Sequence, residues 1–156
     1  MFRKMRRFAQ QVSEDECLKI LKEEPRGVLA VLGDEGYPYT VPMDFVYDNG
    51  KIYFHCAKEG HKIDAINSYD KVSFCVMNKG FKKSGEWALN ITSVVVFGRI
   101  SIVQNNDFAE EKLRLLGLKY YPNKEDVEEE MRKAAKRACV LELNIEHMTG
   151  KLVNES

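Results

Sequence analysis

The fold is decided by residues 38–62, which read PYTVPMDFVYDNGKIYFHCAKEGHK. Apolar and polar side chains alternate as far as Tyr47, the pair Asn49-Gly50 favours a tight two-residue turn, and a second run ends at His55-Cys56-Ala57. Gly60-His61-Lys62 then begins a predicted short helix that extends to Tyr69. We therefore expect a β-hairpin that delivers a glycine, a histidine and a lysine together at the start of a helix.

The size and charge of the chain set limits on its class. It has 156 residues, with 24 basic and 24 acidic side chains, so we predict one domain over residues 1–156 and no nucleic-acid partner. The basic cluster at residues 3–7 is not followed by an apolar stretch long enough for a signal peptide or a membrane span. We expect a cytoplasmic protein that does not bind a membrane.

The four cysteines, at positions 17, 56, 75 and 139, lack Cys-x-x-Cys spacing and are too sparse for a secreted disulfide scaffold. This distribution agrees with a reducing compartment. We interpret most of these cysteines as core or strand residues.

The rest of the pattern favours strands with peripheral helices. Ser13 and Glu16 form a capping-box pattern before a helix that Pro25 stops, and a helix ended by Gly117 is followed by another after Asn123. Further strands are predicted at 28–32, covered on both faces, and at 72–77, 92–103 and 139–145. Gly98 indicates a bulge or bend. About six strands joined by turns or short helices predict an α+β, mainly β protein built on an antiparallel barrel.

Gly60-His61-Lys62 is the best candidate for an anion site. A helix N-terminus supplies free backbone N–H groups and a partial positive charge, and His61 and Lys62 add side-chain donors. These residues could hold a phosphate. The alternative is that Gly60 only starts the helix and that both side chains are solvated.

Other chemistry has weaker support. His55, Cys56 and His61 are possible zinc ligands, but adjacent strand residues point to opposite faces, so we expect no metal site. Ser93 could face a ligand or be an ordinary outward strand residue. Trp87 could stack on a ligand, close a subunit interface or pack in the core.

With these residues in view, the chain resembles the FMN-binding split β-barrel superfamily related to pyridoxamine phosphate oxidase, and specifically its nitroimidazole-resistance branch. Nearly the whole chain takes part in the resemblance. Its motifs are residues 26–30, 36–42, 45–47, 52–57, 60–62, 71–76, 93–98 and 149–151.

The resemblance implies a six-stranded Greek-key split barrel and a homodimer with two FMN sites at the subunit interface. Val41, Pro42 and Met43 would line the flavin ring, and His55, Cys56 and Ala57 would run beside the cofactor. Gly60, His61 and Lys62 would hold its phosphate end or the adjoining ligand pocket. Ser93 and Val94 would be further contacts.

The implied activity is an FMN-dependent oxidoreductase that takes electrons from NAD(P)H or another donor and reduces a small aromatic or nitroheterocyclic acceptor. His61 is the candidate catalytic residue, as a proton donor or substrate contact, because histidine exchanges protons near neutral pH. A non-catalytic flavin or haem sensor is the alternative. Vitamin B6 oxidation is disfavoured, because the family's phosphate-gripping C-terminal arginine has no counterpart after Arg137.

Overall fold

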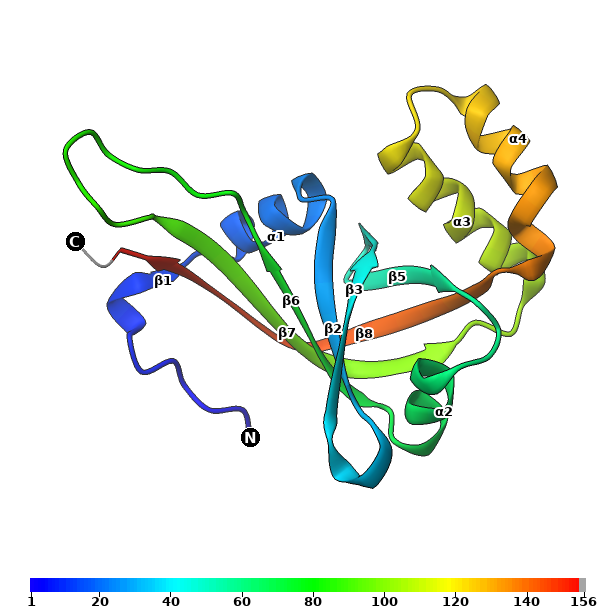
Figure 1. Ribbon diagram of the computed structural model, residues 1–156, viewed down its shortest axis with the longest axis horizontal. Coiled ribbons are helices and arrows are strands. Elements are labelled where there is room, and N and C mark those ends of the chain that lie inside the picture. Colours follow the sequence, from blue (N-terminus) through cyan, green and yellow to red (C-terminus); the bar gives the residue numbers. More distant parts are fainter. Residues whose placement is uncertain (155–156) are drawn as a thin grey trace.

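The computed structural model describes residues 1–154 and is built around one antiparallel sheet that curls into a split barrel (Figure 1). Within the described part, the sheet has eight strands. They are β1 (Gln11–Val12), β2 (Arg26–Leu32), β3 (Pro38–Asp44), β4 (Val46–Asp48), β5 (Lys51–Cys56), β6 (Lys71–Met77), β7 (Ile91–Ile102) and β8 (Cys139–Val153). Seven strands follow the order β3-β2-β6-β7-β8-β5-β4, and β1 pairs with β8. The antiparallel split barrel is thus confirmed, with eight strands in place of six.

Residues 1–154 form four α helices: α1 (Glu14–Glu23), α2 (His61–Ser68), α3 (Asn106–Tyr120) and α4 (Lys124–Ala134), of which α4 packs on α3. Short 3-10 turns are formed by Phe8–Gln10, Asp34–Gly36 and Ala135–Arg137. The side chain of Ser13 caps α1 in the predicted capping box with Glu16. Among the described residues, none of these helices has the length and apolar character needed to span a membrane.

The barrel is filled by one apolar cluster to which the sheet, α1 and α2 contribute. Phe74 lies at its centre, with ring centroids 4.9 Å from Phe45 and 5.0 Å from Phe54, both in edge-on contact. Helix α1 buries Cys17, Ile20 and Leu21 in this cluster, and α2 buries Ile63, Ala65 and Ile66. Helix α3 packs on the outer side of β4, β5 and β8 and forms a second, smaller cluster there.

The predicted strand from Pro38 to Tyr47 is interrupted at Phe45, which divides it into β3 and β4. The last turn of α3 explains the break. The Tyr120 hydroxyl accepts the Phe45 N–H at 2.9 Å, and the Phe45 carbonyl accepts Lys119 Nζ at 3.0 Å. These contacts replace sheet hydrogen bonds, so β3 pairs with β2 and only β4 pairs with β5. The Asn49-Gly50 turn is confirmed between β4 and β5.

Two further expectations are corrected. Gly117 does not end its helix, because α3 continues to Tyr120. A Cβ at Gly117 would lie 3.0 Å from a methyl group of Val127, so this glycine permits close packing of α3 on α4. Strand β2 is not covered on both faces in this chain, since its burial alternates and Val28 remains 37% exposed. The expected irregularity at Gly98 is confirmed as a register shift between β7 and β8.

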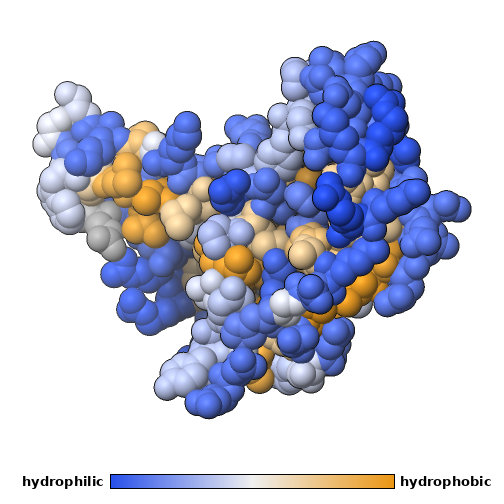
Figure 2. Space-filling view, turned by 45° about the vertical axis from the view of Figure 1, so that its right-hand side comes forward, coloured by the Kyte–Doolittle hydropathy of each residue, from blue (hydrophilic) through white to orange (hydrophobic). Residues whose placement is uncertain are grey.

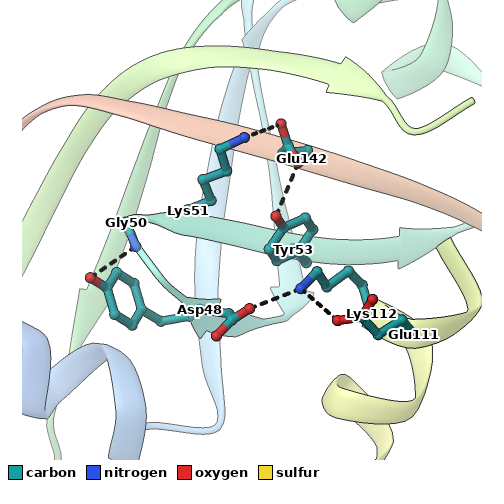
Figure 3. A network of polar contacts seen from close by, with 8 residues as sticks. Asp48, Gly50, Lys51, Tyr53, Glu111, Lys112 and Glu142 are labelled. Atoms are coloured by element: carbon teal, nitrogen blue, oxygen red, sulfur yellow. Dashed lines mark hydrogen bonds and ion pairs between the residues drawn. The ribbon is translucent and has the colours of Figure 1, made fainter. Parts of the chain in front are cut away.

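A polar network ties the β4–β5 hairpin to α3 and β8 (Figure 3). Lys112 of α3 is almost completely buried and donates to Asp48 at 2.9 Å and to Glu111 at 3.2 Å. On the other side of the hairpin, Glu142 of β8 accepts from Tyr53 and Lys51. This network fixes β5, which carries His55 and Cys56 at its end.

Candidate functional site

The candidate site lies where β5 ends and α2 begins. Gly60 has a φ of 125°, a conformation that favours glycine, and it accepts the first helical hydrogen bond from the Asp64 N–H at 3.1 Å. No side chain caps α2. The N–H groups of its first turn therefore have no partners from within the helix and can serve an external acceptor.

Lys62 is the half-buried cation of this site. Its Nζ lies 3.5 Å from the Sδ of Met43 at the end of β3, and a thioether is only a weak hydrogen-bond acceptor. Among the described residues, no carboxylate is ion-paired with Lys62. Lys62 also acts on the Cys56 thiol, where burial raises the pKa to about 11 and the lysine charge opposes this rise. Met43, Cys56 and Lys62 are therefore brought together, and within residues 1–154 no carboxylate pairs with the positive charge of Lys62.

Strand β3 adds a free backbone edge to this cluster. Among the described strands it is the end strand of the sheet and pairs with β2 alone, so backbone groups on its other side are open to a ligand. Val41 is half-buried against the core, whereas Pro42 is exposed. Proline is tolerated at a sheet edge, where fewer ladder hydrogen bonds are required.

His61 is held against the turn between β2 and β3. Its ring stacks on Tyr39 with centroids 4.3 Å apart, and its Nε2 accepts the Asp34 N–H at 3.2 Å. With Nε2 as the acceptor of this bond, Nδ1 is the ring nitrogen left for another partner. A Cβ at Gly33 would approach Nε2 to 3.0 Å, so Gly33 leaves room for this contact. Tyr39, Asp34 and Gly33 were not predicted as site residues, although Tyr39 lies in the motif at residues 36–42.

His55 and Cys56 point to opposite faces of β5, as expected for neighbouring strand residues. Cys56 packs against the barrel core, whereas His55 lines a separate cavity of about 290 Å³ between the sheet and the α3–α4 pair. Asp44 and Tyr120 also line this cavity, together with apolar side chains of α3 and α4. Ala57, the next residue, is exposed. Within residues 1–154, no three histidine, cysteine or acidic side chains converge in a way that could hold a metal.

Ser93 and Val94 lie apart from this cluster in one chain. They pair with Met77 and Val76 at one end of β6, whereas α2 leads into the other end of β6, at Lys71. Lys71 and Met77 are six residue steps apart along the strand, which is about 20 Å. The Val94 side chain is fully buried in the core, and Ser93 is half-buried. A single chain therefore does not bring Ser93 and Val94 to Lys62.

Comparison with known proteins identifies the family. The sequence matches the family described as pyridoxamine 5'-phosphate oxidase over residues 13–152. The chain belongs to the pyridoxamine 5'-phosphate oxidase family. No curated protein matches this family member in the sequence comparison.

Solved structures share the fold of this oxidase-family chain at low sequence identity. A Bacteroides thetaiotaomicron protein named for 5-nitroimidazole antibiotic resistance has a TM-score of 0.78 and 19% identity, over 91% of this chain and 86% of that one. A FAD-binding protein from Mesorhizobium loti has a TM-score of 0.66 and 23% identity, over 92% and 97%. A FAD- and heme-binding protein from Mycobacterium smegmatis has a TM-score of 0.76 and 20% identity, over 94% and 74%.

Proposed function

We propose that this protein is a cytoplasmic, FMN-dependent oxidoreductase that binds FMN with its phosphate at Lys62 and the start of α2. The observation that carries the proposal is the half-buried Lys62 ammonium, whose hydrogen-bond partner is the Met43 thioether. A phosphate would supply the missing negative charge and would accept from the free N–H groups of the first turn of α2. Membership of the pyridoxamine 5'-phosphate oxidase family and the flavin-binding neighbours support the choice of ligand.

The residues around Lys62 fit a flavin as well as a phosphate. The open edge of β3 at Val41, Pro42 and Met43 offers backbone groups beside the lysine, with carbonyl acceptors on all three residues and N–H donors on Val41 and Met43 only. A flavin ring carries both donors and acceptors along its polar edge. Cys56 and Ala57 lie at the end of β5, a strand that contacts β3 without pairing with it. FMN, when bound, would supply the electron-transfer chemistry. The protein would determine the position of the flavin, the access of substrates to it and its electrostatic surroundings.

Lys62→Glu tests the phosphate site. Reversing the charge places like charges side by side, which costs several kcal/mol, and we expect FMN affinity to fall by at least about 100-fold. The matched control is Lys124→Glu, the same reversal at an exposed position of α4, which should bind FMN normally. Equal FMN affinity in the two variants would contradict the placement.

His61 is the proposed proton donor or substrate contact. Its Nε2 is engaged by the Asp34 N–H, and its Nδ1 remains available to a substrate. We expect His61→Ala to lower turnover with a nitroheterocyclic acceptor and NADPH more than it lowers FMN content. Turnover that is unchanged per bound FMN would remove His61 from the mechanism.

We also propose a homodimer, joined through the outward face of β2, β6 and β7. This face exposes Val28, Leu32, Met77 and Phe97, each between 37% and 55% exposed, and register aligns Val28, Cys75 and Val95 across the three strands. Figure 2 shows hydrophobic surface exposed in the middle of the molecule, in contrast to the hydrophilic surface of the helical pair at the upper right. A partner that covered this face would bury β2 on both sides, and could bring its own Ser93 and Val94 toward the flavin.

The dimer is tested by measuring the solution mass of Val28→Glu. We expect a monomer that has lost FMN, because a charge on the apolar face opposes association. Leu118→Glu changes an exposed leucine of α3 and should remain dimeric. A wild-type monomer that still retains FMN would contradict the interface.

The alternative is a flavin or haem sensor without turnover. It is favoured by the structural neighbours named as a flavocytochrome and as a FAD- and heme-binding protein. Anaerobic addition of NADPH to the FMN-loaded protein separates the two. Bleaching of the flavin absorbance supports the oxidoreductase, and flavin that stays oxidised with NADH, NADPH and dithionite-linked donors supports the sensor. Chromatography of the released cofactor distinguishes FMN from FAD.

A further inference from the structure

Two of the four cysteines lie directly opposite each other in the sheet. Cys56 is the last residue of β5, Cys139 is the first residue of β8, and the strand register pairs them with each other. The Cα atoms of opposed residues in an antiparallel pair are about 4.5 or 5.5 Å apart, and both values lie within the range that a disulfide spans. Their side chains leave the sheet on the same face.

The two side chains are close enough for each to influence the pKa of the other thiol. Cys139 is 7% exposed, whereas Cys56 is half-buried and is the sulfur that a small reagent reaches first. The other cysteines are placed differently, because Cys17 is buried in α1 and Cys75 lies on the outward face of β6.

Burial and the nearby positive charges act in opposite directions on the two thiols. Burial raises the pKa of both thiols, so the resting state near neutral pH is the dithiol. Lys62 opposes this rise at Cys56, and Lys58 and Lys62 oppose it at Cys139. Burial outweighs these lysines and both pKa values stay raised, but the nearby positive charges make the thiolates less unfavourable than burial alone would.

We propose that Cys56 and Cys139 form a reversible redox site, which a low-molecular-weight disulfide converts from a dithiol to an intramolecular disulfide. The Cys56 thiolate attacks one sulfur of the small disulfide, forms a mixed disulfide and releases one small thiol. Cys139 then loses its proton and attacks the Cys56 sulfur, which forms the Cys56–Cys139 bond and releases the second small thiol. Two electrons and two protons pass from the protein to the reagent. The strand register pairs the two cysteines without any contribution from the proposed flavin, although Cys56 and Lys62 also belong to the proposed FMN site.

The test uses the full protein and 2-hydroxyethyl disulfide, a small uncharged reagent. Trypsin cleaves after lysine and arginine, and it separates the four cysteines into peptides 8–19, 52–58, 72–79 and 138–151. After oxidation, blocking of free thiols and digestion, we expect peptide 52–58 joined to peptide 138–151, with the mass of both less two hydrogen atoms. Dithiothreitol should release the two peptides.

Three variants complete the experiment. Cys56→Ser and Cys139→Ser should each abolish the joined peptide, and Cys75→Ser, the matched control, should leave it unchanged. The wild-type peptide map decides the question even if a variant fails to fold. The proposal is overturned if peptides 52–58 and 138–151 stay free, carry only the mixed disulfide, or join to the peptides that contain Cys17 or Cys75.

Discussion

Lys119 gives the protein an unusual dependence of stability on pH. Its ammonium group donates to the carbonyls of Phe45 at 3.0 Å and Leu21 at 3.4 Å, and it lies 3.7 Å from the centroid of the Phe45 ring. Burial is the main cause that lowers its pKa from the usual 10.5 to about 8, which the carboxylates of Asp44 and Glu24 only partly oppose.

The sign of the effect follows from proton binding. Below pH 8 both the folded and the unfolded chain hold the proton. Between about pH 8 and 10.5 the unfolded chain still holds it and the folded chain has lost it, so this group makes the protein more stable as pH rises. The full difference in pKa corresponds to about 3.4 kcal/mol. Because the side chain is only half-buried, solvent screening reduces the expected gain to about 1.5 kcal/mol.

Urea unfolding of the wild type and of Lys119→Met measures this contribution. The difference in unfolding free energy, wild type minus variant, should increase by about 1 kcal/mol between pH 7.5 and 9.5. Subtracting the unfolding free energy of the variant from that of the wild type cancels the contributions of tyrosine and cysteine titration, which are the same in both proteins. Lys124→Met, at an exposed position, should show a constant difference. A constant difference for Lys119→Met as well would refute the reasoning.

Two further substitutions test the fold. Asp48→Asn removes the charge that faces the buried Lys112 at 2.9 Å. It should lower the unfolding free energy in urea by about 1–2 kcal/mol. Glu129→Gln, in an exposed ion pair of similar length, should have no measurable effect, and equal effects of the two substitutions would contradict the role of burial. Gly98→Ala would place a Cβ against the backbone carbonyl of Asn144, so we expect the free energy of unfolding to fall by about 2 kcal/mol or more. An unchanged melting temperature would contradict this prediction, because it would mean that the bulge relaxes around the added methyl group.

The sequence predicts the parts of the fold that depend on neighbouring residues. The Asn49-Gly50 turn, the capping box at Ser13 and the bulge at Gly98 were recognisable because each has a local chemical cause. The break at Phe45 was not, since it depends on hydrogen bonds from Lys119 and Tyr120, about 75 positions later.

Gly117 shows the same limit in a helix. Glycine at this position is a local signal for the end of a helix. In the structure a glycine is required there because the side chain of Val127, on another helix, packs against it. The alternation of burial in β2 was hidden by a run of apolar residues at 28–32. A run of apolar residues is compatible with a strand whose outward face is buried by a second protein, as well as with one buried by the same chain.

The candidate site could be predicted only in part. Gly60-His61-Lys62 was marked by residue types that suit a phosphate, and the structure places them at the first turn of α2. The sequence did not indicate that His55 would face the cavity beside α3, nor that His61 would stack on Tyr39. It also gave no sign that Cys139 would meet Cys56, because a strand register cannot be read from either cysteine alone.

The central claim is that Lys62 and the start of α2 hold FMN. The most direct measurement is the visible absorbance of the purified protein after incubation with excess FMN and removal of the free cofactor. We predict flavin bands that correspond to one FMN per chain in the wild type and to almost none in Lys62→Glu. A wild-type protein that keeps no flavin, or a Lys62→Glu variant that keeps as much as the wild type, would contradict the account.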